Sequence, residues 1–233
     1  NPNVVPTFTP VAAICSGATL SALPTTSNNG ITGAWAPALS NTTTTTYTFT
    51  PTAGQCATTT TLTITVNPNV VPTFNPVAAI CSGATAPVLP TTSTNGITGT
   101  WSPATVSNTA TATYTFTPTA GQCATTTTLT VTVNPNVVPT FTPVAAICSG
   151  ATLTALPTTS NNGITGTWAP ALSNTTTTTY TFTPTAGQCA TTTTLTITVN
   201  PNVVPTFNPV AAICSGATAP VLPGTSTNGI TGT

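Results

Sequence analysis

Cysteine is the residue type in this chain best suited to covalent chemistry, and seven cysteines occur in 233 residues. Lys, Arg, Asp, Glu and His are all absent. A Ser or Cys nucleophile therefore has no side chain to activate it, and nothing can act as a general acid or base near neutral pH. Zinc sites would lack histidine, and hard-cation sites would lack carboxylates. We expect no catalytic residue, no metal site and no cofactor, so the chain is not predicted to be an enzyme.

The cysteines follow an internal repeat. The octapeptide NPNVVPTF begins four times, at Asn1, Asn67, Asn134 and Asn200. The resulting period of 66 or 67 residues is too long for a solenoid coil and fits a small β domain. The sequence thus predicts four tandem segments, which we call repeats 1 to 4: residues 1–66, 67–133, 134–199 and a partial repeat at 200–233.

Each complete repeat has two cysteines, which predicts one disulfide per repeat. A module of about 66 residues buries little surface, and closing a loop of about 40 residues would add about 4 kcal/mol. Pairing within repeats joins Cys15 to Cys56, Cys81 to Cys123 and Cys148 to Cys189, and leaves Cys214 unpaired. The alternative pairs neighbouring repeats across the linker: Cys56 with Cys81, Cys123 with Cys148 and Cys189 with Cys214.

One tryptophan lies between the two cysteines of each complete repeat, at Trp35, Trp101 and Trp168. The order Cys, Trp, Cys is typical of immunoglobulin-like sandwiches, in which the indole packs in the core. We therefore expect these three rings to be core residues. The alternative is an exposed platform on which a carbohydrate stacks.

Strand-like alternation surrounds these residues. Tyr47 and Phe49 alternate with threonines, and so do Leu62, Ile64 and Val66. A period of two places the apolar side chains on one face and the hydroxyls on the other. These residues predict two strands joined by a PTAGQ turn, the second running over residues 56–66. No helical pattern appears, and NPNVVP has the prolines of a short, stiff linker. The predicted fold is all-β: tandem Ig-like β-sandwich modules of about 66 residues.

The lack of charge restricts the partners of the chain. Without Lys or Arg it cannot neutralise phosphates, so nucleic acid is excluded. No apolar run reaches the ~18 residues of a membrane span. Cysteine-rich small domains are typical of oxidising compartments, which predicts an extracellular location. Because no signal peptide opens the sequence, we expect an interior segment of a longer exported protein.

Three motifs carry a resemblance to a known family: AICSGAT, LPTTSxNGITGxW and YTFTPTAGQCATTTTLTxTV. They resemble the tandem repeats of giant gliding-motility and surface adhesins of Bacteroidetes-type bacteria, and the resemblance spans essentially the whole chain. It implies export through the type IX secretion route, display at the cell surface and a stalk of Ig-like modules. It implies no catalytic residue.

The expected function is that of a structural stalk or fibre segment of an extracellular adhesin or filament. A chain without net charge also favours self-association into fibres or bundles. One alternative is ice binding by a threonine row. Another is carbohydrate binding by the tryptophans. Repeat 4 is interpreted as a truncated module, with completion by another chain as the alternative. The row that would bind ice comprises Thr59, Thr61, Thr63 and Thr65.

Overall fold

The computed structural model describes residues 2–233, and these residues form strands, turns and loops without a helix. The chain divides into two compact units, Asn1–Pro135 and Asn136–Thr233. The first unit contains repeats 1 and 2, and the second contains repeats 3 and 4. The prediction of tandem all-β modules is confirmed, because repeats 1 to 3 have the same five strands in the same order.

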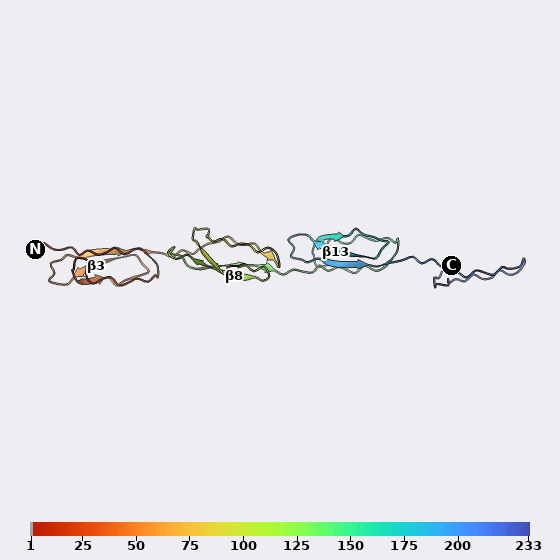
Figure 1. The fold of residues 1–233 in the computed structure, drawn as a ribbon, viewed down its shortest axis with the longest axis horizontal. Helices are drawn as coiled ribbons and strands as arrows, with labels where there is room; N and C mark the ends of the chain where they lie inside the picture. Colours follow the sequence, from red (N-terminus) through yellow and green to blue (C-terminus); the bar gives the residue numbers. More distant parts are fainter. Residues whose placement is uncertain (1) are drawn as a thin grey trace. The chain divides into compact units, whose positions relative to one another are not determined.

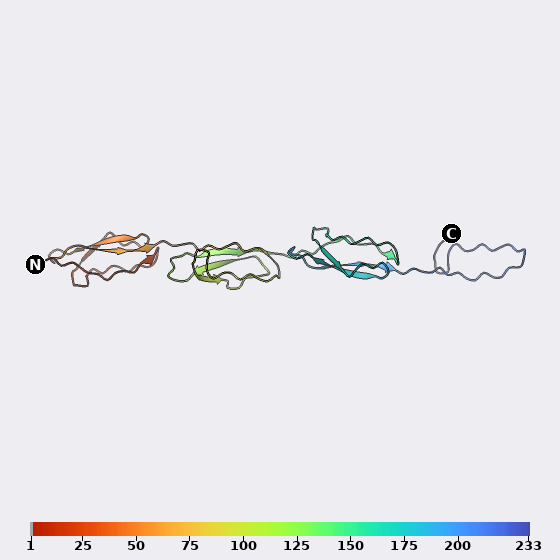
Figure 2. The same cartoon turned by 90° about the horizontal axis from the view of Figure 1, so that it is seen from above.

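Each complete repeat combines a three-stranded antiparallel sheet with a two-stranded parallel ribbon (Figures 1 and 2). In repeat 1 the sheet has the order β2-β3-β4 and the ribbon pairs β1 with β5. The strands of repeat 1 are β1 (Ile14–Cys15), β2 (Gly33–Ala36), β3 (Thr45–Pro51), β4 (Thr60–Ile64) and β5 (Val66–Asn67). Those of repeat 2 are β6 (Ile80–Cys81), β7 (Gly99–Ser102), β8 (Ala112–Pro118), β9 (Thr127–Val131) and β10 (Val133–Asn134). Those of repeat 3 are β11 (Ile147–Cys148), β12 (Gly166–Ala169), β13 (Thr178–Pro184), β14 (Thr193–Ile197) and β15 (Val199–Asn200).

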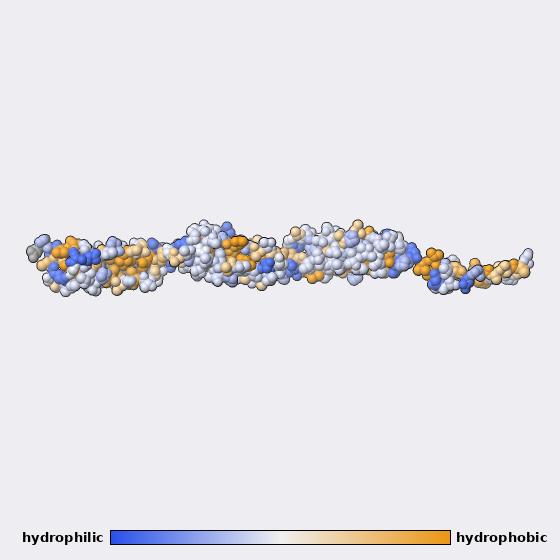
Figure 3. Space-filling view, in the orientation of Figure 1, coloured by the Kyte–Doolittle hydropathy of each residue, from blue (hydrophilic) through white to orange (hydrophobic). Residues whose placement is uncertain are grey.

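The alternation in the central hairpin divides core from surface as predicted. Tyr47 and Phe49 on β3 and Ile64 on β4 are fully buried. Threonines occupy the opposite face, where the hydroxyls of Thr46 and Thr63 lie 2.8 Å apart across the two strands. Threonine suits this position because its branched Cβ fits the pleat and its hydroxyl stays in contact with water. In Figure 3 the pale shades of intermediate hydropathy are most extensive over repeat 3, while orange areas are also visible over repeat 1.

Three aromatic rings meet in each core. In repeat 2 the ring of Trp101 lies 4.7 Å from that of Phe74 and 5.1 Å from that of Phe116, measured between centroids. Trp101 is buried, and its indole N–H donates to the carbonyl of Pro90 over 2.8 Å. Trp35 and Trp168 make the equivalent ring contacts but are half-buried.

Two predicted boundaries differ from the structure. The strand expected over residues 56–66 begins at Thr60, because Cys56 still belongs to the turn and has a φ of 46°. The expected boundary between residues 66 and 67 lies inside β5, which pairs with β1 through Ile14↔Val66 and Cys15↔Asn67. The first residue of the NPNVVP segment therefore completes the ribbon of the preceding repeat.

Repeat 4 differs from the others. After Asn200 its described residues form no strand, and a single bridge joins Thr225 to Thr231. In Figure 2 this segment, the blue end of the chain, is an open loop without strand arrows. Its apolar residues are correspondingly exposed, with Phe207 at 56% and Leu222 at 70%.

Candidate functional site

The disulfide in the first unit joins two neighbouring repeats. Cys15 of repeat 1 is bonded to Cys123 of repeat 2, across a sequence separation of 108 residues and with Cα atoms 4.9 Å apart. Cys56, the expected partner of Cys15, has a free and exposed thiol. The prediction that each repeat closes its own disulfide is therefore wrong for repeat 1.

The two cysteines of one repeat cannot meet because the register places them at different ends. Cys15 lies opposite Asn67, where the chain leaves repeat 1. Cys56 lies where the chain enters it, since its carbonyl accepts a 2.8 Å hydrogen bond from the amide of Val4. A disulfide requires Cα atoms within about 7 Å, so only a cysteine from the next repeat can reach Cys15.

The alternative linkage across the linker is also wrong. Each of its three pairs contains one cysteine that is free, and the free cysteines are Cys56, Cys148 and Cys214. Cys214 is unpaired, as the scheme of pairing within repeats predicted. Four cysteines are disulfide-bonded: Cys15, Cys81, Cys123 and Cys189.

The linker between repeats 1 and 2 is hydrogen-bonded on both sides. The Asn69 side-chain amide donates to the carbonyl of Ser16 in repeat 1, over 3.0 Å. One residue later, the Val70 amide donates to the Cys123 carbonyl over 2.8 Å, and the Thr125 amide donates to the Val70 carbonyl over 3.0 Å. The segment predicted to be a plain linker is therefore part of a junction, which we define as residues 15–16, 67–70 and 122–125.

Gln122 positions Cys123, which follows the PTAGQ turn of repeat 2. The Gln122 carboxamide accepts a hydrogen bond from the amide of Thr98 and donates to its carbonyl, both over 2.8 Å. Cys123 follows with a φ of 45°, in the left-handed region that L-residues seldom occupy. Cys56 has nearly the same φ while its thiol is free, so the disulfide is not what imposes this backbone conformation.

Replacing Gln122 with alanine is expected to weaken the junction. Two hydrogen bonds to the backbone of Thr98 are lost, which lowers the free energy of unfolding by about 1–2 kcal/mol. The yield of the Cys15–Cys123 disulfide, measured by peptide mapping after oxidation, should fall as well. Gln55→Ala is the matched control, because Gln55 makes the same bonds to Thr32 beside a free cysteine. An unchanged disulfide yield in Gln122→Ala would contradict the positioning role.

The junction residues other than cysteine were not found by sequence reasoning. Asn69 and Gln122 are identical in every complete repeat, but that identity is shared by most of their neighbours and does not single them out. Trp101 is buried in the core of repeat 2, whereas Trp35 and Trp168 are half-buried and pack against the cores of their own repeats. Each of the three donates its indole N–H to a proline carbonyl. Within residues 2–233 no group of three or more Cys, His, Asp or Glu residues could hold a metal ion.

Comparison with protein-family models and with curated proteins finds no match for this chain. Nor do residues 2–233 contain any helix with the length and apolar character needed to cross a bilayer. The disulfides indicate an oxidising environment, either extracellular or periplasmic.

Proposed function

We propose that this chain is a structural segment of an extracellular stalk or fibre in which neighbouring repeats are covalently coupled. The observation that carries the proposal is the Cys15–Cys123 bond, since a disulfide between two folded repeats has no role in the folding of either one alone. The absence of Lys, Arg, Asp, Glu and His agrees with a role without catalysis.

The coupling changes the path of a mechanical load. Tension applied to the two ends of an unbonded chain passes through every residue of its backbone. With the bond in place, tension that reaches Cys15 passes directly to Cys123, and residues 16–122 carry none of it. The core strands β3 and β8 lie in this protected segment. Residues 16–122 therefore keep their length under a load that would unfold them in an unbonded chain.

The cellular setting belongs to the same proposal. The motifs that resemble gliding-motility adhesins, together with the oxidised cysteines, support a cell-surface stalk exported by the type IX route. Lateral association into fibres stays a prediction based on the absence of charge. The ice-binding alternative has less support, because the strand threonines bond one another, as Thr46 and Thr63 do.

Pulling single molecules tests the mechanical role. In a chain with Cys81→Ser and Cys189→Ser, the remaining bond is Cys15–Cys123, which excludes about 108 residues from extension. At 3.3–3.6 Å per residue, the oxidised chain should release roughly 36–39 nm less contour length than the reduced chain. Force spectroscopy between terminal handles measures this difference directly.

The control for this measurement adds Cys15→Ser and Cys123→Ser to the same chain. Its released length should equal that of the reduced parent and should not respond to reductant. If the oxidised and reduced parents release equal lengths, the bond does not carry load and the proposed function fails.

A further inference from the structure

The dipeptide Asn-Gly occurs once in every repeat. The four pairs are Asn29-Gly30, Asn95-Gly96, Asn162-Gly163 and Asn228-Gly229, and every other asparagine is followed by Pro, Val, Thr or Asn. The backbone nitrogen after an asparagine can attack that residue's own side-chain carboxamide, and glycine hinders the attack least because it has no side chain. The Asn-Gly pairs are therefore the positions of this chain at which deamidation is chemically easiest.

The turn itself requires the glycine. Gly30 has a φ of 85°, in the left-handed region where a residue with a side chain is strained. Its amide donates to the carbonyl of Ser27 over 3.0 Å, and the Ser27 amide donates to the carbonyl of Ile31 over 2.8 Å. The residue that closes the turn is thus also the one that makes the preceding asparagine reactive.

The side chain of Asn29 is held by three hydrogen bonds, which we call the asparagine clamp. Its Oδ1 accepts from the Ser27 hydroxyl over 2.7 Å and from the Thr7 amide over 3.2 Å. Its Nδ2 donates to the carbonyl of Val5 over 2.9 Å. Ser27 is buried, and its hydroxyl also accepts from the amide of Ile31 over 2.9 Å. Deamidation must bring the carboxamide carbon onto the next backbone nitrogen, and the clamp opposes that movement.

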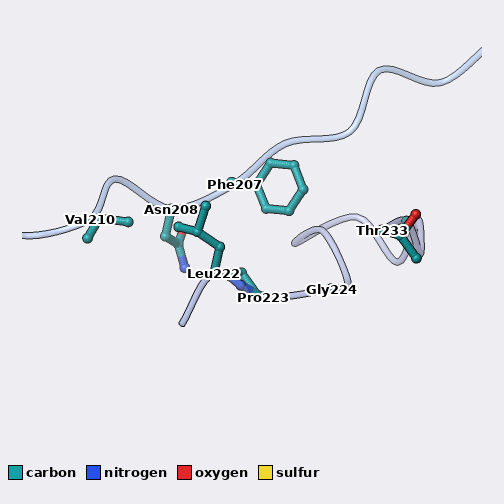
Figure 4. Close-up of a pocket in the computed structure, with 8 residues that line it drawn as sticks. Phe207, Asn208, Val210, Leu222, Pro223, Gly224 and Thr233 are labelled. Carbon is teal, nitrogen blue, oxygen red and sulfur yellow. The ribbon is translucent and has the colours of Figure 1, made fainter. Parts of the chain in front are cut away.

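The clamp is a regular feature of the repeat. The other complete repeats form the same three bonds at lengths between 2.6 and 3.2 Å. These bonds join Asn95 to Ser93, Thr73 and Val71, and Asn162 to Ser160, Thr140 and Val138. Repeat 4, part of which Figure 4 shows around Phe207 and Gly224, has the equivalent bonds at Asn228.

We propose that the Asn-Gly turn of repeats 1 to 3 is an autocatalytic modification site that the folded repeat holds closed and that unfolding opens. In an unfolded repeat the clamp is lost, the asparagine deamidates, and the product prevents the repeat from refolding. Brief unfolding is therefore reversible, whereas prolonged unfolding is recorded in the covalent structure of the chain. This site goes beyond the proposed function, because it responds to unfolding by denaturant as well as by force.

The reaction consumes water and needs no enzyme. Hydroxide removes the N–H proton of Gly30, and the nitrogen attacks Cγ of Asn29. The bond between Cγ and Nδ2 breaks, and the leaving nitrogen takes a proton from water and departs as ammonia. The product is a five-membered succinimide. A second water molecule opens this ring at either of its carbonyls, which gives aspartate or isoaspartate without any transfer of electrons.

Neither product can restore the clamp. Aspartate has no N–H to donate to the Val5 carbonyl and places a negatively charged oxygen against it. Isoaspartate continues the backbone through the side-chain carbon, which adds one atom to the turn that the Gly30–Ser27 bond closes. Both products introduce a charge into a chain that has no Lys or Arg to pair with it.

Peptide mapping by mass spectrometry tests whether the fold protects the site. The full chain is incubated in mildly alkaline buffer, either oxidised and folded or reduced in urea. Asn29, Asn95 and Asn162 should deamidate at least about tenfold faster in urea, since the clamp must open first. Asn41, which precedes a threonine, is the internal control and should stay largely unmodified in both samples. Equal rates for the folded and unfolded chains would overturn the proposal.

Ser93→Ala tests the clamp in the folded chain. The substitution removes the hydroxyl that bonds Asn95 and the amide of Ile97. In native buffer Asn95 should then deamidate about tenfold faster, while the other two sites in the same molecules keep their parent rates. Thr94→Ala is the matched control, because it removes hydroxyl bonds to Thr73 and leaves the clamp intact. An unchanged Asn95 rate in Ser93→Ala, or an equal rise in Thr94→Ala, would contradict the role of the clamp.

Asn29→Asp tests the effect of the product on refolding. It should raise the equilibrium constant for unfolding repeat 1 about tenfold, because the bond to Val5 is lost. Asn28→Asp is the control: it places the same charge one residue earlier, where the side chain makes a 3.4 Å bond to Thr9. Urea titration followed by Trp35 fluorescence measures both, in chains whose other tryptophans are phenylalanine. If the two variants are equally stable, the product does not prevent refolding and the proposal is wrong. The force measurement plays no part, so the two proposals can fail separately.

Discussion

Gly99→Val is expected to unfold repeat 2 under conditions in which the parent chain is folded. The new side chain would overlap the Thr117 carbonyl and the Phe116 ring, which has no exposed surface. The backbone cannot move away, because β7 pairs with β8 through Gly99↔Pro118 and Trp101↔Phe116. Expelling the ring is comparable to deleting it, which costs about 3–5 kcal/mol for a buried phenylalanine.

Urea titration followed by Trp101 fluorescence measures this effect, in a chain whose other two tryptophans are replaced by phenylalanine. Gly232→Val is the matched control, since the same substitution at the same repeat position meets no atom within 4 Å. The control should unfold at the midpoint of the parent. A Gly99→Val chain with the parent midpoint would show that repeat 2 can repack around the added side chain.

Loss of the Cys15–Cys123 bond is expected to lower the free energy of unfolding repeats 1 and 2 together by about 4–5 kcal/mol. The bond closes a loop of 108 residues in the unfolded chain, and the chain-entropy model assigns a loop of this length that magnitude. The comparison uses a parent with Cys81→Ser and Cys189→Ser, with and without the added pair Cys15→Ser and Cys123→Ser.

Chemical denaturation of the two chains under oxidising conditions provides the measurement. Reductant should bring the parent down to the stability of the variant and leave the variant unchanged. Cys56→Ser is the control substitution, because its thiol is free, and it should have no effect on either curve. If the free energy of unfolding is the same with and without the bond, the cross-link does not stabilise repeats 1 and 2.

Much of the fold follows from local pattern. The alternation of Tyr47 and Phe49 with threonine predicted a half-buried strand, and β3 buries both rings. The pattern is reliable here because successive side chains of a strand point to opposite faces of the sheet. The face on which each side chain lies therefore depends only on its position along the strand. The limits of β4 were less predictable, since Cys56 precedes a run of threonines that suits a strand or a turn equally well.

The disulfide between repeats 1 and 2 could not be predicted from local sequence pattern. The count and spacing of the cysteines were compatible with both linkages considered, and the structure shows neither. What decides the matter is the parallel pairing of β1 with β5, which brings Cys15 to Asn67 at the exit of its repeat. A parallel pairing between segments some fifty residues apart leaves no mark in local sequence, because it depends on how the whole repeat closes.

The amino-acid sequence by itself determined that this protein lacks Lys, Arg, Asp, Glu and His, that it repeats, and that its repeats are β-structured with threonine outside and aromatic rings inside. Those properties depend on which side chains exist and on their spacing along one strand. Only the tertiary structure decided which cysteines meet and that Asn69 and Gln122 hold the junction between repeats 1 and 2. Disulfide pairing depends on distances of a few ångströms between residues far apart in the chain, and only the folded register sets those distances.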